Sequence, residues 1–287
     1  MIALSAAFSL LLGLAVAGLR ELFDRGIRSM EQVYRHLDMH CLGLLPTISR
    51  FRRGGSSPEA YLVKMPTSAY AEATRSVLTG ILFASAKTPR VVAVTSARPN
   101  EGKTSTAISM ARLNALAGRR SIILDLDLRK PELHKRLKAR ATAGVVEFLN
   151  EQATFIDVVQ KDEATGLDFI VAGRRTSNSV ELLRSKHLTD LLIELGRAYD
   201  LVIIDAPPVL ALADARLTAR LADTTLLIVR WGRTTPEVAR LAVRQLMNVG
   251  THIAGVAISM VNVRRNALYT NSDSEAFTGE FRRYYSG

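Results

Sequence analysis

The chain has 287 residues, of which 48% are hydrophobic, and a formal net charge of +11 at pH 7. This length and composition are sufficient for one sizeable core with appendages, and the single cysteine, Cys41, excludes an internal disulfide and a cysteine metal cluster. The positive charge indicates a basic surface that faces anionic lipid, an acidic polymer or nucleic acid, or that is solvated without a dedicated partner.

The first predicted element is a membrane-spanning helix over residues 1–20. Residues Ile2 to Leu19 carry no charge and would form about 27 Å of helix, just enough to span a hydrocarbon core. A signal peptide would have positive residues before the apolar stretch, and a buried amphipathic helix would have a polar face. The basic residues instead follow the stretch, which places the rest of the chain on the cytoplasmic side. They are Arg20, Arg25, Arg28 and Arg35.

Residues 21–67 are predicted to be a juxtamembrane segment and a linker. The stretch from Arg50 to Pro58 is basic, then rich in Gly and Ser, and ends in Pro. Such a composition buries too little apolar surface to stay ordered. The stretch is either a plain hydrophilic tether or a segment whose arginines rest on anionic lipid headgroups, at roughly 1 kcal/mol each.

Residues 68–263 alternate predicted helices and strands, which is typical of an α/β fold with a parallel sheet covered by helices on both faces. A helix from Tyr70 to Ala84 comes first, and Gly118 and Gly250 stand where later helices are expected to end. Strands are expected near residues 91–95, 121–125, 168–171, 201–205, 225–230 and 254–259, and helices near 103–117, 144–150, 154–160, 185–197, 213–221 and 236–248.

A phosphate-binding loop is predicted between the strand at 91–95 and the helix that follows it. In the stretch SARPNEGKTS, Gly102 allows close backbone approach, Lys103 supplies a cation and Thr104 a magnesium-ligating hydroxyl, although Ala97 stands where the common pattern has Gly. The free N–H groups of the helix start favour phosphate. The triplet alone is equally compatible with an ordinary turn between a strand and a helix. The candidate nucleotide-binding residues are Ala97, Arg98, Pro99, Asn100, Glu101, Gly102, Lys103, Thr104 and Ser105.

Carboxylates follow two further apolar strands. Asp125 and Asp127 occupy alternate positions at the end of SIILDLD, so they project to the same face if the strand continues. Asp205 ends the strand LVIID, in the form of a segment whose carboxylate supports magnesium. A single Asp at a strand end is commonly a turn former, but three of them beside a phosphate loop indicate a ligand site, because open parallel sheets bind ligands at these ends.

From Ser68 to Val263 the chain resembles the cytoplasmic kinase domain of the bacterial tyrosine kinases (BY-kinases) that accompany exopolysaccharide polymerisation and export, relatives of the MinD/ParA ATPases. The resemblance rests on the order and separation of four stretches: SARPNEGKTS, SIILDLDLRKP, the block from NSVELL to IIDAPPVL, and Asp214 in ALADA. It implies a P-loop NTPase-like α/β fold and a non-specific protein-tyrosine kinase that phosphorylates itself.

The resemblance also implies ATP and Mg²⁺ as cofactors. Lys103 would grip the β- and γ-phosphates, Thr104 would ligate the metal, and Asp205 would hold its water shell. Asp125 would receive the hydroxyl proton, and Asp127 would lie close to the metal or the acceptor. Placement and charge stabilisation would then account for most of the catalysis. Arg129 would either neutralise phosphate charge or form a structural ion pair with a nearby helix.

The tail, residues 264–287, is polar and is expected to be flexible. In the family such a tail carries tyrosines that the neighbouring subunit of a ring phosphorylates, which makes Tyr269, Tyr284 and Tyr285 the candidate acceptors, unless they are incidental. Glu72 and Arg75 fit the family's interface helix, although Leu78 stands at the third position of that stripe. A local pair within the helix is the alternative for Glu72 and Arg75.

Partners follow from the same resemblance. Residues Leu42 to Pro46 look like the motif after the second of two helices that bracket an extracytoplasmic chain-length domain. That domain is expected on a longer protein or a separate chain, alongside polysaccharide polymerase and export proteins and membrane lipids. The expected location is the bacterial inner membrane, with a single span and a cytoplasmic kinase domain. No nucleic acid is expected, because no DNA-binding motif is present.

Two departures keep other functions open. Ser259 stands where relatives have an Asn placed to bond adenine, and it lacks the bidentate amide. Arg98 stands where the MinD/ParA ATPases have a signature lysine, and it is expected to be exposed. The alternatives are a MinD/ParA-like ATPase and a non-catalytic nucleotide-binding co-polymerase subunit that regulates polymer length by assembly alone.

Overall fold

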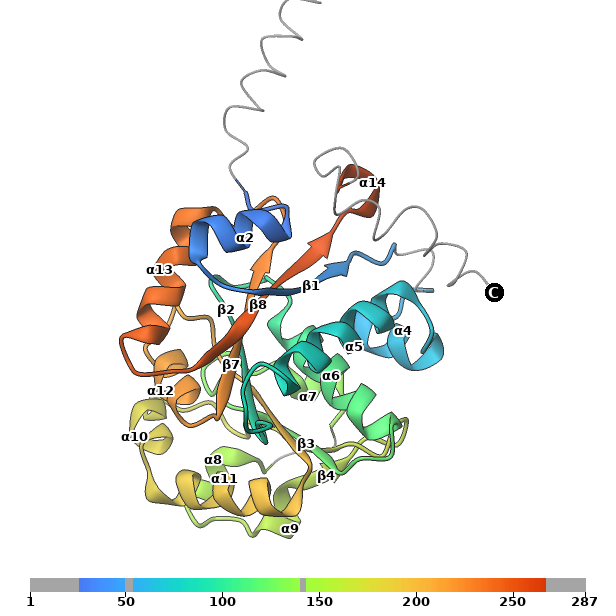
Figure 1. Ribbon diagram of the computed structural model, residues 1–287. Coiled ribbons are helices and arrows are strands. Elements are labelled where there is room, and N and C mark those ends of the chain that lie inside the picture. The colour runs from blue at the N-terminus through green and yellow to red at the C-terminus, as the bar shows by residue number, and fades with distance from the viewer. Residues whose placement is uncertain (1–25, 50–53, 140–142, 267–287) are drawn as a thin grey trace, which may run out of the picture.

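The computed structural model describes residues 26–49, 54–139 and 143–266. These residues form one eight-stranded sheet with helices on both faces (Figure 1). The predicted span at residues 1–20 and most of the predicted tail lie outside the described residues. Within the described part of the chain, no helix is both long enough and apolar enough to cross a bilayer.

The sheet has the strand order β1-β8-β7-β2-β6-β3-β5-β4. The strands are β1 (Cys41–Pro46), β2 (Val91–Ser96), β3 (Ser121–Asp125), β4 (Val159–Lys161), β5 (Asp168–Ile170), β6 (Leu201–Asp205), β7 (Thr224–Arg230) and β8 (Ile253–Val261). The helices are α2 (Met30–Leu37), α4 (Pro58–Lys64), α5 (Ala69–Leu82), α6 (Lys103–Leu116), α7 (Leu133–Arg136), α8 (Val145–Leu149), α9 (Phe155–Val158), α10 (Ser179–Leu183), α11 (Lys186–Ala198), α12 (Asp214–Arg220), α13 (Pro236–Met247) and α14 (Val263–Asn266).

The central strands are buried on both faces, as the apolar runs in the sequence predict. Successive residues of β2 point to opposite sides: Val92 and Val94 pack with α5 and α6, and Ala93 packs with the cluster that contains α8 and α11. Helices α2, α12 and α13 cover the β7–β8 end of that second face (Figure 1). The predicted α/β architecture of a P-loop NTPase is therefore confirmed.

The prediction of a fully parallel sheet is wrong at one edge, where β4 pairs with β5 in antiparallel fashion. The tight turn over residues 162–167 joins these strands, with Gly166 in the left-handed region at φ 74°. Such a short connection cannot return the chain to the start of a parallel neighbour. The helix expected over residues 154–160 accordingly ends at Val158, and β4 begins at the next residue.

The opposite edge of the sheet comes from a part of the chain that was predicted to be linker. Strand β1 pairs in parallel with β8, with Leu44 opposite Ile258. Helix α2 precedes it, begins at the capping residue Ser29, and buries Val33 and Leu37 in the cluster that also contains α13. The predicted core boundary at residue 68 leaves out this strand and helix, because β1 is a short apolar segment that only its pairing with β8 identifies as sheet.

A buried ion pair ties the central helix α6 to the β4–β5 edge. Both nitrogens Nε and Nη2 of Arg112 donate to the carboxylate of Asp162, at 3.0 Å each, and Nη1 donates to the backbone oxygen of Glu59 at 2.9 Å. The two side chains are only 7% and 8% exposed. Because both charges are desolvated, removal of one partner leaves the other uncompensated.

Replacement of Arg112 by Leu is expected to lower the free energy of unfolding by about 3–5 kcal/mol, because it leaves the buried Asp162 carboxylate without a compensating charge. Urea unfolding followed by circular dichroism measures this change. Arg197→Ala is the matched control: it removes an arginine that is 73% exposed and pairs with Glu194 on its own helix, and should cost less than about 1 kcal/mol. Equal losses in the two variants would contradict the account.

Candidate active site

The loop between β2 and α6 has the geometry that a phosphate-binding loop needs. Gly102 adopts φ 92° immediately before the first residue of α6, a conformation that favours glycine. Ala97 is fully buried in the apolar cluster beneath α12 and α13, and does not have a positive φ, so the usual Gly is not required there. Arg98, Pro99 and Asn100 are exposed at the crest of the loop. The exposure of Arg98 agrees with the sequence prediction.

A buried carboxylate braces this loop from within. Glu101 accepts a hydrogen bond from the backbone N–H of Arg98 at 2.8 Å and a short one from the hydroxyl of Thr234. The hydroxyl of Ser259 donates to the backbone oxygen of Glu101. Burial raises the pKa of Glu101, and its hydrogen bonds oppose that rise.

These hydrogen bonds give Ser259 a structural role in the loop. Its hydroxyl bonds to the loop and to the backbone oxygen of Val229 at 3.3 Å, so in this structure it supports the loop and is not free for a base. The sequence indicated no partner for Glu101, because Thr234 and Ser259 lie more than a hundred positions away along the chain.

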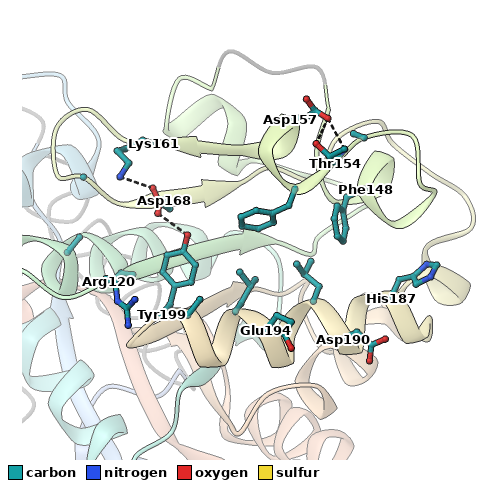
Figure 2. Close-up of a pocket in the computed structure, with 18 of the residues that line it drawn as sticks. Arg120, Phe148, Thr154, Asp157, Lys161, Asp168, His187, Asp190, Glu194 and Tyr199 are labelled. Carbon is teal, nitrogen blue, oxygen red and sulfur yellow. Dashed lines mark hydrogen bonds and ion pairs between the residues drawn. The ribbon is translucent and has the colours of Figure 1, made fainter.

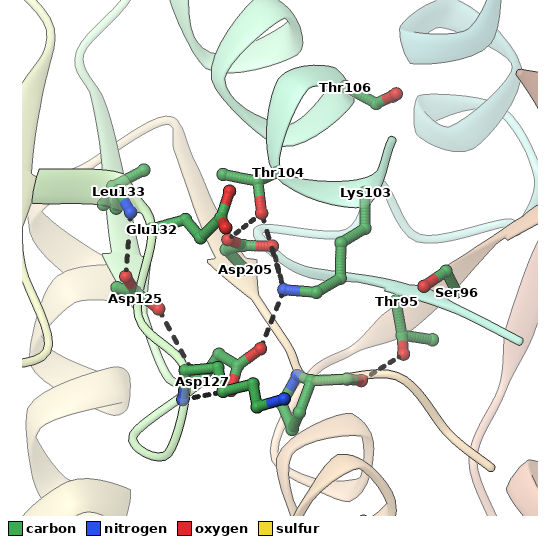
Figure 3. Close-up of polar contacts among 12 residues, drawn as sticks. Thr95, Ser96, Lys103, Thr104, Thr106, Asp125, Asp127, Glu132, Leu133 and Asp205 are labelled. Atoms are coloured by element: carbon green, nitrogen blue, oxygen red, sulfur yellow. Dashed lines mark hydrogen bonds and ion pairs between the residues drawn. The ribbon is translucent and has the colours of Figure 1, made fainter. Parts of the chain in front are cut away.

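Lys103 lies at the centre of a polar cluster at the carboxyl ends of the central strands (Figure 3). Its Nζ is 3.1 Å from Oδ2 of Asp127 and 3.2 Å from Oδ1 of Asp205, and the hydroxyl of Thr104 donates to Oδ2 of Asp205 at 2.7 Å. Burial of the amine would lower the pKa of Lys103, but the charges of Asp205 and Asp127 outweigh it and raise the pKa.

Asp125 is buried beneath this polar cluster. It is fully buried and stands opposite Asp205 in the parallel pair β3–β6. Its two oxygens accept hydrogen bonds from the backbone N–H groups of Asp127 and Leu133, at 3.1 Å each (Figure 3). Burial, assisted by the charge of Asp205, raises the pKa of Asp125 to about 8. The pKa of Asp205 is raised as well, chiefly by burial.

The structure therefore brings together all four residues predicted to serve a phosphate and a metal: Lys103, Thr104, Asp127 and Asp205. Among the described residues, no three carboxylate, imidazole or thiolate side chains are placed to hold a metal by themselves. The oxygen donors fit Mg²⁺ in the form in which it commonly binds, through one or two carboxylates together with phosphate oxygens and water. The amine and the free N–H groups of the α6 start suit the phosphates.

Three other predicted residues form ion pairs within the protein. Arg129 donates from Nε to Asp214 at 2.9 Å and to the hydroxyl of Ser179 at 3.2 Å, so it joins α10 to α12, the second of the two predicted alternatives. Glu72 and Arg75 form an ion pair on the surface of α5. Leu78, at the third position of that stripe, is buried in the core beneath α5. The candidate acceptors Tyr269, Tyr284 and Tyr285 lie outside the described residues.

Known proteins resemble this chain in both sequence and fold. Residues 89–249 match the family model described as AAA domain. The chain is 33% identical over 218 residues to the tyrosine-protein kinase YwqD of Bacillus subtilis (strain 168), an alignment that covers 75% of this chain and 92% of YwqD. It is 27% identical over 313 residues to the succinoglycan biosynthesis transport protein ExoP of Rhizobium meliloti (strain 1021), covering 99% of this chain and 40% of ExoP.

The solved kinase domain of the Escherichia coli tyrosine kinase ETK superposes on the chain with a TM-score of 0.78 at 27% identity, covering 83% of this chain and 96% of that domain. The longer curated relatives extend well beyond the aligned segment, because the chain spans only 29–40% of their length.

The Lys103 cluster makes the stability of the ligand-free chain depend on pH. The pKa of Asp125 is raised from 3.8 to about 8, so its contribution to stability is complete below about pH 4 and is lost as the pH rises towards 8. Lys103→Met removes the compensating charge. In EDTA and without nucleotide, it is expected to lower the free energy of unfolding by about 3 kcal/mol or more at pH 8. The loss should be smaller at pH 5, because the raised pKa values of Asp125 and Asp205 favour their neutral forms there.

Urea unfolding at the two pH values measures this difference. Lys161→Met serves as the control, because Lys161 is an exposed lysine paired with Asp168, and it should cost less than about 1 kcal/mol at both pH values. A loss for Lys103→Met that is the same at pH 5 and pH 8 would show that the carboxylates do not depend on the amine as described.

Proposed function

We propose that the chain, which belongs to the family of bacterial tyrosine-protein kinases, transfers the γ-phosphoryl group of ATP to tyrosine hydroxyls of its own tail. Its match to the AAA domain model covers residues 89–249. The observation that carries the proposal is the convergence of Lys103, Thr104, Asp127 and Asp205 at one end of the sheet. The loop Ala97–Ser105 would hold the phosphates of the nucleotide.

Each side chain of the site has a part in this reaction. Lys103 would bind the β- and γ-phosphates, and Thr104, Asp127 and Asp205 would hold Mg²⁺ and its water shell. The metal, when bound, supplies charge neutralisation on the phosphates. The tyrosine oxygen attacks the γ-phosphorus, the bond to the β-phosphate oxygen breaks, and ADP leaves.

Asp125 is the proposed acceptor of the tyrosine proton. Burial and the charge of Asp205 raise the pKa of Asp125 in the ligand-free structure, and a carboxylate with a raised pKa accepts a proton more readily than an ordinary one. The carboxyl is fully buried in the ligand-free structure, so the reaction requires Asp127 and the segment leading to Leu133 to shift enough for the hydroxyl to approach.

The biological role that we propose is regulation of exopolysaccharide or capsular polysaccharide chain length, polymerisation and export. The relative ExoP, a succinoglycan biosynthesis transport protein, aligns with 99% of this chain and supports this role. The proposal includes anchoring by the apolar residues 1–20 in the bacterial inner membrane, contact with lipid headgroups, and association with an extracytoplasmic chain-length domain or with polymerase and export proteins.

Phosphorylation of the tail is the first test. With Mg·ATP labelled at the γ-phosphate, the full chain should incorporate label at Tyr269, Tyr284 or Tyr285, as mapped by mass spectrometry. Changing these three tyrosines to Phe should abolish that label, and Asp125→Ala should slow labelling about 100-fold while nucleotide affinity is retained. Release of free phosphate without labelled protein would favour the MinD/ParA-like ATPase. Neither product would favour the non-catalytic co-polymerase subunit.

Assembly into a ring is the second test, because transfer to a neighbour's tail requires one. We propose that Glu72 and Arg75 exchange their local ion pair for pairs across the interface. Arg75→Glu should then abolish assembly in sedimentation velocity and reduce tail phosphorylation at low protein concentration. Arg35→Glu is the matched control, because Arg35 pairs with Glu31 on its own helix and on another face. Assembly that persists in Arg75→Glu, or that both variants lose equally, would contradict this interface.

A further inference from the structure

A second cleft lies along the β4–β5 edge of the sheet, apart from the Lys103 site. It encloses about 1340 Å³ between α11 and the segment that carries α8, α9 and β4 (Figure 2). Ser121, the first residue of β3, lines it, whereas Asp125 of the candidate active site ends the same strand, about 13 Å further along. None of the residues of the proposed phosphoryl transfer lines this cleft.

The floor of the cleft is apolar and aromatic. Phe148 and Phe155 enter it from α8 and α9, and both are only partly buried by the protein. Leu191 and Leu195 line it from successive turns of α11, and the ring of Tyr199 closes one end. Half-covered aromatic rings on rigid elements provide contact area for another aromatic side chain at little further entropic cost.

The rim of the cleft carries opposite charges at its two ends (Figure 2). One end is basic: Arg120 and Lys161 lie near Tyr199, whose hydroxyl donates to Asp168 at 2.9 Å. The acidic residues of the other part of the rim are exposed, and they stand out in a chain with a net charge of +11. They are Glu151, Asp157, Asp190 and Glu194.

We propose that this cleft binds the last residues of the chain itself, Glu280 to Gly287, with the sequence EFRRYYSG. Phe281 and the two tyrosines match the aromatic floor, and Arg282 and Arg283 match the acidic rim. The charges and the aromatic side chains of this segment therefore complement those of the cleft.

The length of the chain beyond the described residues permits this contact. Fourteen residues lie between Asn266 and Phe281, so the extended segment spans about 50 Å, which matches the diameter of a compact chain of this size, whose radius of gyration is about 19 Å. The segment therefore reaches the cleft of its own copy or that of a neighbour.

Docking has a regulatory consequence, which rests on the proposed kinase function. Each phosphate on Tyr284 or Tyr285 adds about −1.5 to −2 charges and would face the acidic rim. Phosphorylation therefore releases the segment, and the cleft holds the tail only until it is modified. The docking of the unmodified tail does not depend on kinase activity.

Photo-crosslinking of the full chain without ATP tests the docking directly. With benzoylphenylalanine in place of Phe281, cross-links mapped by mass spectrometry should join it to peptides that contain Phe148, Phe155 or Leu191. Reversing the rim charge with Asp190→Lys and Glu194→Lys should lower the yield about 5-fold. Glu31→Lys should leave it unchanged, because Glu31 is exposed to the same degree as Glu194, 66% against 68%, and likewise pairs with an arginine of its own helix.

Cross-links at the Lys103 site, cross-links spread over the surface, or a yield that the rim variants do not change would overturn the docking. Synthetic peptides of residues 276–287 test the release: the unmodified peptide should compete for the cross-link at least 10-fold better than the form phosphorylated at Tyr284 and Tyr285. Equal competition would overturn release by phosphorylation. Because ATP is absent, these outcomes are independent of whether the chain is a kinase.

Discussion

The amine of Lys103 is the interaction on which the rest of the site depends. It lies between carboxylates that come from two different strand ends, Asp127 after β3 and Asp205 at the end of β6, and without it their charges would repel one another. Parallel pairing of β3 with β6 fixes Asp125 opposite Asp205, so the sheet brings the acids together and the amine makes their proximity tolerable.

The loop that presents Lys103 is itself held by distant parts of the fold. The side chain of Glu101 accepts a hydrogen bond from Thr234, which follows β7, and its backbone oxygen accepts one from Ser259 of β8. The β7–β8 part of the sheet therefore holds the loop in place. At the other end of α6, Arg112 joins the helix to the β4–β5 turn through Asp162. The helix that begins at the phosphate loop is thus anchored at both ends, and the second cleft lies beside its far end.

The sequence predicted the central part of this fold well, because β2, β3, β6 and β7 are apolar runs buried on both faces. It did not predict β1 or β4. The segment Val159–Lys161 is too short to show a pattern, and only the turn before β5 makes it a strand; Cys41–Pro46 becomes a strand only by pairing with β8. The convergence of Lys103 with Asp127 and Asp205 could be predicted, because the carboxyl ends of parallel strands meet at one edge of the sheet. The bonds of Glu101 and Ser259 could not, because no spacing in the sequence reports a contact between such distant residues.

The most direct test of the account is a calorimetric titration of the full chain with ATP and with ADP, each with and without Mg²⁺. Both nucleotides are expected to bind, and to bind more tightly with Mg²⁺. Lys103→Met is expected to abolish binding, whereas Lys161→Met should bind like the unmodified chain. Absence of heat and affinity in the unmodified chain, or unchanged affinity in Lys103→Met, would contradict the claim that this amine and these carboxylates form one nucleotide and metal site.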